Sequence, residues 1–232
     1  MGLSVIIPVG KKDSSWKNLL PDLLTLDLND EIILVSAEDK ETEFSEEVSR
    51  IGLETPSYWL QSNPGRAQQL NLGAQFAKKE FLWFLHCDSR ISPDGIKNLR
   101  NFILSEIDQI LFFNLEFLND GPRLTIINEI GAWIRSRILK LPFGDQGICV
   151  PKRIFYDLGK YDESVSFGED HLFIWRAHQK HISIKCVGGG LRTSARKYSS
   201  QGWSETTATH LSLTFQQALP ELIQFFRMKW FS

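Results

Sequence analysis

Strand-like apolar runs alternate with helix-forming segments over the first ninety residues, and this alternation constrains the fold more than any other feature. The runs are rich in β-branched and aromatic residues, and they occupy residues 3–9, 31–36, 57–62 and 80–86. Continuous apolar runs of this length are typical of strands that are buried on both faces of a sheet. Strands that alternate with helices through short loops form βαβ units. We therefore expect an α/β fold with a mostly parallel central sheet flanked by helices on both faces.

The helix-forming segments between these runs differ in how clearly the sequence marks them. Residues 66–79 carry four small or aliphatic side chains on one predicted inner face, namely Ala67, Leu70, Ala74 and Ala77. Residues 14–28 also show helical spacing of apolar residues, but Pro21 interrupts them. A proline inside a helix removes a hydrogen bond and clashes with the preceding turn, so this helix is kinked or begins later.

The second half of the chain is less regular than the first. Helical patterns occupy 93–105, 124–141, 168–181 and 206–230, and strand-like runs occupy 109–119, 146–151 and 182–189. The segment 124–141 predicts an amphipathic helix, with an apolar stripe formed by Ile127, Ile130, Trp133 or Ile134, and Ile138. The last helix carries the apolar residues Phe215, Leu219, Leu222, Phe226 and Trp230. Because no repeat or linker is evident, we expect a single domain over residues 1–232.

Composition excludes several classes of protein. The chain has 26 basic and 28 acidic residues, so its formal net charge of -2 gives no reason to expect a nucleic acid partner. Cys87, Cys149 and Cys186 lack metal-type spacing and are interpreted as free thiols of a reducing compartment, which predicts a cytoplasmic protein. No signal peptide is recognisable, and no segment approaches the roughly 20 apolar residues of a membrane span.

Polar residues follow the fourth apolar run at the point where the predicted strand ends. His86, Cys87 and Asp88 come directly after it. Ligands of open α/β sheets bind beyond the carboxyl ends of the strands, so these side chains are candidates for a metal or phosphate site. The alternative is that Asp88 only caps the helix that begins near Pro93.

Five motifs occur in one order along the chain: Gly65-Arg66-Ala67-Gln68-Gln69-Leu70-Asn71-Leu72-Gly73, His86-Cys87-Asp88-Ser89, Gly144-Asp145-Gln146-Gly147, Glu169-Asp170 and Thr193-Ser194-Ala195-Arg196. Together they resemble the family 2 glycosyltransferases of the GT-A fold, and most closely the small bacterial branch associated with arsenosugar-type biosynthesis. The resemblance covers residues 3 to about 203. It implies a nucleotide-sugar-binding half over 1–90, an acceptor half over 91–205 and a C-terminal helix over 206–232.

The resemblance implies a metal-dependent inverting glycosyltransferase that moves a sugar from a nucleotide-diphosphate donor to an acceptor hydroxyl. A divalent cation, Mn²⁺ or Mg²⁺, neutralises the departing diphosphate in such a reaction. The residues matched to the metal are Asp88 and His86. The residues assigned to the donor are Arg66, His86, Asp88 and Arg196, with Asp39 as a substitute where the family pattern has no clean match. Those assigned to the acceptor are Asp145, Gln146 and Trp203. Glu169 and Asp170 match the catalytic pair.

Physical arguments accompany three of these matches. Arg66 stands at the first turn of a helix, where a guanidinium and free backbone N–H groups together hold a phosphate; an ordinary solvated arginine is the alternative. Asp170 is the expected base that takes the acceptor's proton, with its basicity raised by partial burial, although acids in a first helical turn are also common caps. Gly73 is expected to allow close packing of its helix on the sheet.

Other readings stay open at this point. The segments that hold the nucleoside in the wider family have no clean match, with Asp13, Glu38 or Asp39 as substitutes, so a degenerate GT-A protein acting as a binding or scaffold subunit is the alternative. A nucleotidyltransferase is disfavoured because its glycine-rich N-terminal loop is missing. The acceptor is a small molecule or is linked to a lipid. For the C-terminal helix, packing or a homodimer contact is favoured over peripheral contact with the inner face of a membrane, because it has few basic residues.

Overall fold

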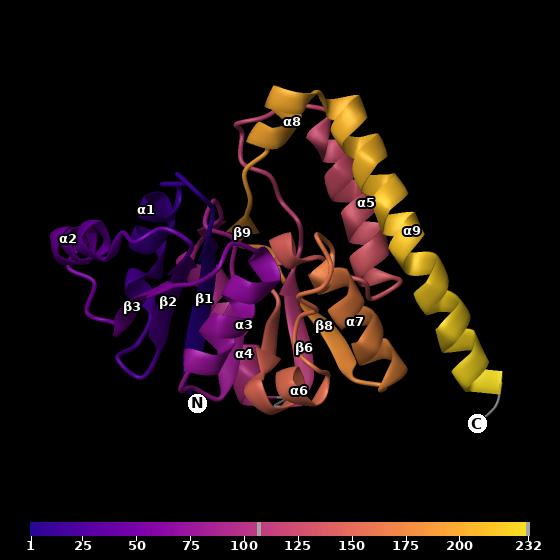
Figure 1. The fold of residues 1–232 in the computed structure, drawn as a ribbon, viewed down its shortest axis with the longest axis horizontal. Helices are drawn as coiled ribbons and strands as arrows, with labels where there is room; N and C mark the ends of the chain where they lie inside the picture. Colours follow the sequence, from indigo (N-terminus) through magenta and orange to yellow (C-terminus); the bar gives the residue numbers. More distant parts are fainter. Residues whose placement is uncertain (106–107, 231–232) are drawn as a thin grey trace.

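The structure, a computed structural model, describes residues 1–105 and 108–230. The side chains of residues 200, 201, 210 and 224–230 lie outside that description, and so do the predicted apolar positions Phe226 and Trp230. The predicted α/β fold with a mostly parallel sheet is confirmed, as the arrangement of the elements in Figure 1 shows.

One sheet runs through both halves of the molecule. In the described residues it has seven strands in the order β3-β2-β1-β4-β7-β6-β8. The strands are β1 (Leu3–Val9), β2 (Glu31–Ser36), β3 (Ser57–Gln61), β4 (Phe81–Phe84), β6 (Gln109–Phe113), β7 (Cys149–Pro151) and β8 (Ser183–Gly188). All neighbours pair in parallel except those of β7, which runs antiparallel to β4 and β6. A short ribbon of β5 (Arg90–Ile91) and β9 (Leu191–Arg192) lies beyond it.

Helices cover both faces of the sheet. They are α1 (Trp16–Leu19), α2 (Glu41–Ile51), α3 (Arg66–Phe76), α4 (Pro93–Ser105), α5 (Thr125–Arg137), α6 (Lys152–Asp157), α7 (Glu169–Gln179), α8 (Arg196–Gln201) and α9 (Trp203–Trp230), with 3₁₀ turns η1 (Leu20–Thr25) and η2 (Gly144–Gln146). Side chains of β1 alternate between the two cores: Val5 and Ile7 pack with Trp16 of α1, whereas Ile6 packs with Ala74 of α3. Both faces are therefore apolar, as the continuous runs predict.

Two local features follow from single residues. The helix expected over 14–28 stops at Leu19 and continues as the 3₁₀ turn η1, because Pro21 cannot donate the hydrogen bond that an α-helix requires there. A Cβ atom added to Gly73 would lie against the Ile6 side chain of β1. The expected close approach of α3 to the sheet is confirmed, and it places the first turn of α3 at the sheet's carboxyl edge.

The amphipathic helix predicted in the middle of the chain is present as α5, but its apolar stripe does not face the core. Ile127, Ile130, Ile134 and Ile138 are exposed, whereas Ala132 and Ser136 are buried. A surface helix normally turns its apolar stripe inward. In α5 the orientation is reversed.

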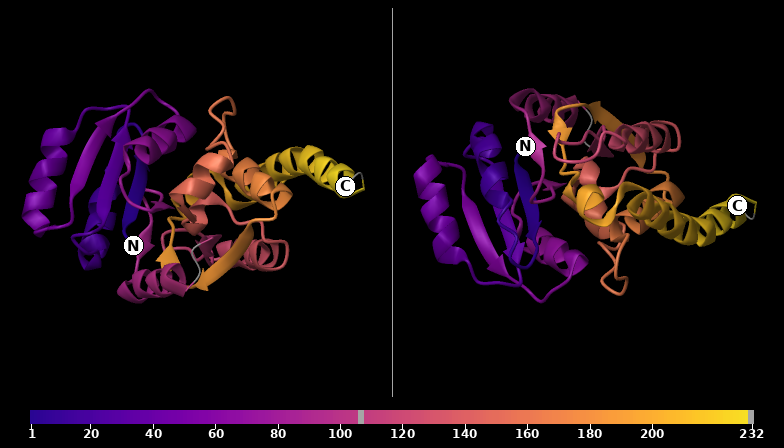
Figure 2. Two further views of the ribbon diagram at one scale, coloured as in Figure 1. Left: turned by 90° about the horizontal axis from the view of Figure 1, so that it is seen from below. Right: turned by 90° about the horizontal axis from the view of Figure 1, so that it is seen from above.

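The C-terminal helix α9 begins at Trp203 and extends past the edge of the sheet, as both views of Figure 2 show. Its predicted apolar residues Phe215, Leu219 and Leu222 are exposed. Among the described residues, no helix has the combination of length and hydropathy needed to cross a bilayer.

Candidate active site

A pocket of about 350 Å³ opens beyond the carboxyl end of β4. It brings together polar side chains from distant parts of the sequence, and these are Arg66, His86, Asp88, Asp145 and Asp170. Aromatic side chains complete its wall, among them Phe117, Phe143 and Phe167. A larger, open hollow of about 880 Å³ beside α3 is lined mainly by amides, and none of the described residues around it is a predicted site residue.

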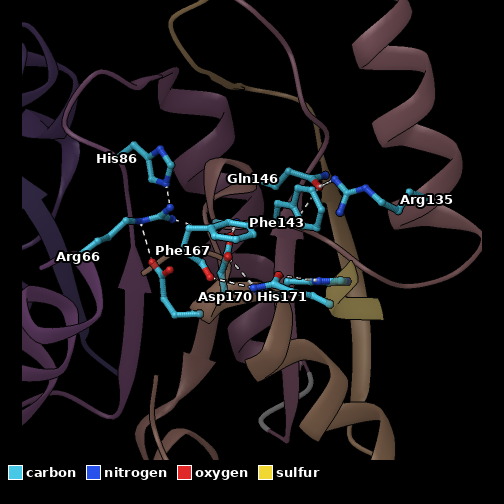
Figure 3. A network of polar contacts seen from close by, with 11 residues as sticks. Arg66, His86, Arg135, Phe143, Gln146, Phe167, Asp170 and His171 are labelled. Atoms are coloured by element: carbon cyan, nitrogen blue, oxygen red, sulfur yellow. Dashed lines mark hydrogen bonds and ion pairs between the residues drawn. The ribbon is translucent and has the colours of Figure 1, made fainter. Parts of the chain in front are cut away.

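Arg66 is the centre of the polar contacts in the pocket (Figure 3). Its Nε lies 3.1 Å from Glu169 Oε1, and its Nη2 lies 3.8 Å from Asp170 Oδ2. The same Nη2 lies 2.6 Å from His86 Nε2. Arg66 therefore joins the first turn of α3 to the acids of α7 and to the end of β4, and it is not the solvated arginine of the alternative reading.

Asp170 is buried, and backbone N–H groups hold both of its carboxylate oxygens. Gly144 N–H donates to Oδ2, and His171 N–H donates to Oδ1 at 2.9 Å. Burial raises the pKa of Asp170, but the Arg66 charge and these two hydrogen bonds outweigh burial, so the pKa lies below its ordinary value. The expectation that Asp170 gains basicity is therefore wrong: the effect of burial is outweighed, and the carboxylate is held ionised.

A glycine is required where the loop before β7 meets these acids. A Cβ atom at Gly144 would overlap the Arg66 guanidinium and the Asp170 carboxylate. The backbone of η2 can therefore approach Asp170 closely enough for its N–H to donate to it. The hydrogen bond from Gly144 to Asp170 joins the Gly144–Gly147 motif to the Glu169-Asp170 motif. A residue that only capped α7 would not need this bond to a distant loop.

Asp145 is the second carboxylate of the pocket, and its environment differs from that of Asp170. Its Oδ1 is buried and has no hydrogen-bond partner. Burial raises the pKa of Asp145 to about 6, an effect that the Arg135 charge opposes and the nearby Asp170 charge reinforces. Besides Asp88, the pocket thus holds one carboxylate whose pKa is lowered, Asp170, and one whose pKa is raised to about 6, Asp145.

Arg135 and Phe143 form the wall behind these acids. The Arg135 guanidinium lies over the Phe143 ring, 3.3 Å from its centroid, and Phe143 meets His171 edge to face. Burial lowers the pKa of Arg135 to about 10. This leaves the side chain charged at neutral pH, so it adds a positive potential to this wall of the pocket.

Asp88 and His86 differ in their fitness to hold a cation. Asp88 lines the pocket with a partly exposed carboxylate whose pKa is raised, chiefly by burial. Burial and the Arg66 charge lower the pKa of His86 to about 3, so its ring is neutral, but its Nε2 faces Arg66. No cluster of three or more His, Cys, Asp or Glu side chains suited to a metal occurs among residues 1–105 and 108–230. A cation held here would have the Asp88 carboxylate as a ligand and would need further oxygen ligands from another molecule, while Nε2 of His86 is engaged by Arg66.

The capping alternative for Asp88 finds no support in the geometry. At the start of α4 it is the Ser92 hydroxyl that accepts a hydrogen bond, at 3.1 Å from the N–H of Gly95. Asp88 instead lies 3.9 Å from Arg196 Nη2, which also donates to the Ser15 hydroxyl at 2.9 Å. Arg196 thus spans from α8 to the end of β4 and to the N-cap of α1.

Five predicted site residues lie outside the pocket lining. Two of them, Glu169 and Arg196, contact the lining residues Arg66 and Asp88. The other three are Asp39, Gln146 and Trp203. Asp39 is exposed and accepts a hydrogen bond from the Glu41 N–H at the start of α2. Gln146 is fully buried and bonds Phe113 O and the Ser136 hydroxyl, so it supports the wall from behind. Trp203 donates to Asn128 Oδ1 at 2.6 Å, which ties α9 to α5.

Several pocket residues escaped the sequence analysis. They are Phe117, Phe143, Phe167, His171, Lys197, Tyr198, Leu213, Thr214 and Gln217. Phe143 and His171 stand next to two of the motifs in the sequence, and this adjacency could have identified them as pocket residues. The α9 residues gave no signal, because only the fold brings that helix to the pocket, where Gln217 donates to Phe167 O at 2.8 Å.

Comparison with known proteins agrees with this geometry. The sequence model described as Glycosyl transferase family 2 matches residues 4–160. No curated protein matches the chain. Residues 1–349 of S. aureus TarS in complex with UDP-GlcNAc superpose with a TM-score of 0.64 at 20% identity, over 84% of this chain and 58% of that one.

A second solved structure extends the comparison. The mannosyltransferase PcManGT from Pyrobaculum calidifontis, in complex with GDP-Man and Mn²⁺, superposes with a TM-score of 0.67 at 16% identity, over 94% of this chain and 64% of that one. This chain spans less than two thirds of the length of either protein. The likeness shows the GT-A fold. The family match covers more than half of the sequence, so the chain belongs to glycosyl transferase family 2.

Proposed function

We propose that the protein transfers a glycosyl group from a nucleoside-diphosphate sugar to an acceptor hydroxyl, with inversion at the anomeric carbon and with the help of a divalent cation. The observation that carries this proposal is the pairing of two features in one pocket. A buried, ionised Asp170 faces it from α7, and Asp88 faces it from the end of β4. In an inverting transfer a base and a metal ligand act on opposite sides of the reacting sugar, and the presence of both carboxylates in one pocket supports these two roles.

The proposed step balances as a single displacement. The acceptor oxygen bonds to the anomeric carbon while the bond from that carbon to the diphosphate oxygen breaks, and the diphosphate keeps the electron pair. The acceptor's proton passes to the Asp170 carboxylate, which the N–H groups of Gly144 and His171 hold in place. Arg66 offsets the negative charge of Asp170 and Glu169 before the proton arrives.

On the donor side, Asp88 is the residue that would hold a cation. When bound, the cation neutralises charge on the departing diphosphate. The neutral His86 ring keeps Arg66 turned toward the acids. Arg196, 3.9 Å from Asp88, is positioned to bind a diphosphate that enters between them.

The acceptor side is proposed to consist of Asp145 and the aromatic wall. A buried Asp145 Oδ1 without a partner is suited to accept a hydrogen bond from a hydroxyl group. Phe143 and Phe167 offer apolar surface to the acceptor's ring or chain. The finer assignment to the arsenosugar-type branch rests on the five motifs alone.

A transfer assay tests the proposal. Nucleotide sugars with UDP and GDP leaving groups are incubated with and without Mn²⁺, and release of the nucleoside diphosphate is measured. We expect cation-dependent release, and we expect Asp88→Ala to lower it about a hundredfold or more through loss of donor binding. Asp94→Ala, at an exposed position, is the matched control.

The same assay separates this proposal from the degenerate-subunit alternative. That alternative is favoured by the exposed position of Asp39, which accepts a hydrogen bond from the Glu41 N–H and takes no part in the pocket. Calorimetry with the same nucleotides supplies the second readout. Binding without turnover would favour a binding subunit, and the absence of both binding and turnover would contradict the proposed function.

A further inference from the structure

The outer face of α5 exposes many large apolar side chains. It consists of Leu124, Ile126, Ile127, Ile130, Trp133, Ile134, Ile138 and Leu139. Their exposed fractions lie between 47% and 64%. Contiguous exposed apolar patches beyond a few hundred Å² are rare on monomers and mark contact surfaces.

The inner side of the same helix is polar. Its polar side chains bind α9 and the segments that form the wall of the pocket. Asn128 binds Trp203 and Thr207 of α9, and Glu129 accepts the N–H of Phe117. Arg135 stacks on Phe143, a residue of the pocket. The helix therefore cannot rotate to bury its isoleucines without breaking the wall of the active site.

Charge along the outer face has one sign. Exposed Arg123 precedes the face and partly exposed Lys140 follows it. From residue 121 to residue 140 the only acid is Glu129, which is engaged on the inner side. An apolar face with a tryptophan in its middle and cations at its ends matches the hydrocarbon and anionic headgroup layers of a membrane surface.

We propose that the outer face of α5 docks the protein on the surface of an anionic lipid bilayer. The isoleucines and Trp133 enter the boundary between headgroups and acyl chains, and Arg123 and Lys140 contact anionic headgroups. Because the inner side of α5 supports Phe143, docking brings the pocket wall to the membrane. The docking itself is independent of the proposed glycosyl transfer.

A second copy of the chain fits this face less well. In a two-fold contact along α5, antiparallel helices bring Arg123 of one copy near Lys140 of the other, and parallel helices bring identical cations together. Either arrangement sets like charges against each other, with no acid on the outer face to pair with them. A bilayer with anionic lipids offers the complementary charge.

Cosedimentation with vesicles tests the proposal. The full chain is mixed with phosphatidylcholine vesicles that contain or lack phosphatidylglycerol, and the pelleted fraction is measured. We expect binding that requires phosphatidylglycerol and weakens as salt rises. The double variant Ile130→Glu/Trp133→Glu should bind about tenfold more weakly or worse, because it removes two apolar anchors and adds two acids.

The matched control makes the same charge change at exposed leucines away from α5. Leu28 and Leu104 are 67% and 68% exposed, and the double variant Leu28→Glu/Leu104→Glu should pellet like the wild type. Thermal unfolding confirms that both variants are folded. Release of nucleoside diphosphate in the absence of vesicles should be equal in all three proteins, which separates docking from the transfer proposal.

Three results would overturn the docking proposal. The first is a wild type that stays in the supernatant with anionic vesicles, and the second is equal pelleting of the α5 variant and the wild type. The third is a wild-type dimer, seen by light scattering, that the α5 variant dissociates without any vesicle binding. That last result would assign the face to a second copy of the chain.

Discussion

Two helices of this molecule place their large apolar side chains in opposite ways. In α3, Leu70 and Ala74 are buried against the sheet. In α5, Ile130 and Ile134 are exposed, and the polar side of the helix faces inward. The comparison teaches that apolar periodicity identifies an apolar face, whereas what covers that face depends on the rest of the fold.

The two helices also differ in what their inner sides contact. The inner side of α3 meets the apolar strand β1, and only its first residue, Arg66, reaches the pocket. The inner side of α5 meets polar and aromatic side chains such as Phe143 and Gln146. Helix α3 therefore packs mainly on the sheet, whereas α5 packs on side chains that form the wall of the pocket.

The largest effect is the loss of turnover expected when the buried, charged Asp170 is neutralised. Asp170→Asn removes the charged base, and we expect product formation to fall about 10³-fold while donor binding survives. Asp94 gives a matched control, because it is also an acid in a first helical turn but is exposed. If Asp94→Asn and Asp170→Asn lower turnover equally, Asp170 is not the base and the pocket wall loses its proposed role.

The second effect tests the structural side of the comparison. Leu70 is 2% exposed and packs within the core beneath α3. We expect Leu70→Ala to lower the free energy of unfolding by about 2–5 kcal/mol, through lost burial and the cavity left behind. Denaturant unfolding measures this value. A loss below about 1 kcal/mol would mean that α3 is held less tightly than its packing indicates.

The sequence predicts which face of α3 is buried, but it does not predict the orientation of α5. The burial of Leu70 follows from a local pattern beside an apolar strand, and both neighbours are visible in the sequence. The reversed orientation of α5 accompanies contacts of Asn128 with α9, far along the chain, and of Glu129 and Arg135 with the segments before and after the helix. The apolar periodicity of the helix reveals none of these contacts.

The residues of the site also fall into those that the sequence predicts and those that it does not. Asp88 and Asp170 were predictable, because each lies in a motif at the end or start of an element, and the structure brings both to one pocket. Gln146 lies in a motif too, yet it is used inside the wall. Motifs thus located the pocket, but they did not separate residues that line it from residues that support it.

The third effect concerns pH and the second carboxylate of the wall. The pKa of Asp145 is raised to about 6, so the carboxylate is ionised above that pH and is protonated as the pH falls through it. If an ionised Asp145 binds the acceptor hydroxyl, the transfer rate should fall about tenfold per pH unit below pH 6. Asp170, whose pKa is lowered, stays ionised over this range.

The variant Asp145→Asn tests whether Asp145 causes the fall of the transfer rate below pH 6, which is the acid limb of the pH profile. We expect it to lower the rate above pH 6 and to abolish the fall below it, measured as transfer rate against pH. An unchanged acid limb in the variant would assign the limb to another group. Asp162→Asn, a carboxyl outside the pocket lining, serves as the control and should keep the wild-type profile.

The smallest effect completes the comparison with α3. Ile130 is 56% exposed, so its truncation removes little buried surface. We expect Ile130→Ala to change the free energy of unfolding by less than about 0.5 kcal/mol, against the larger loss for Leu70→Ala. Denaturant unfolding of both variants under identical conditions makes the test. A loss above about 2 kcal/mol would show that Ile130 is covered in solution, and light scattering of the same sample would show whether a second copy covers it.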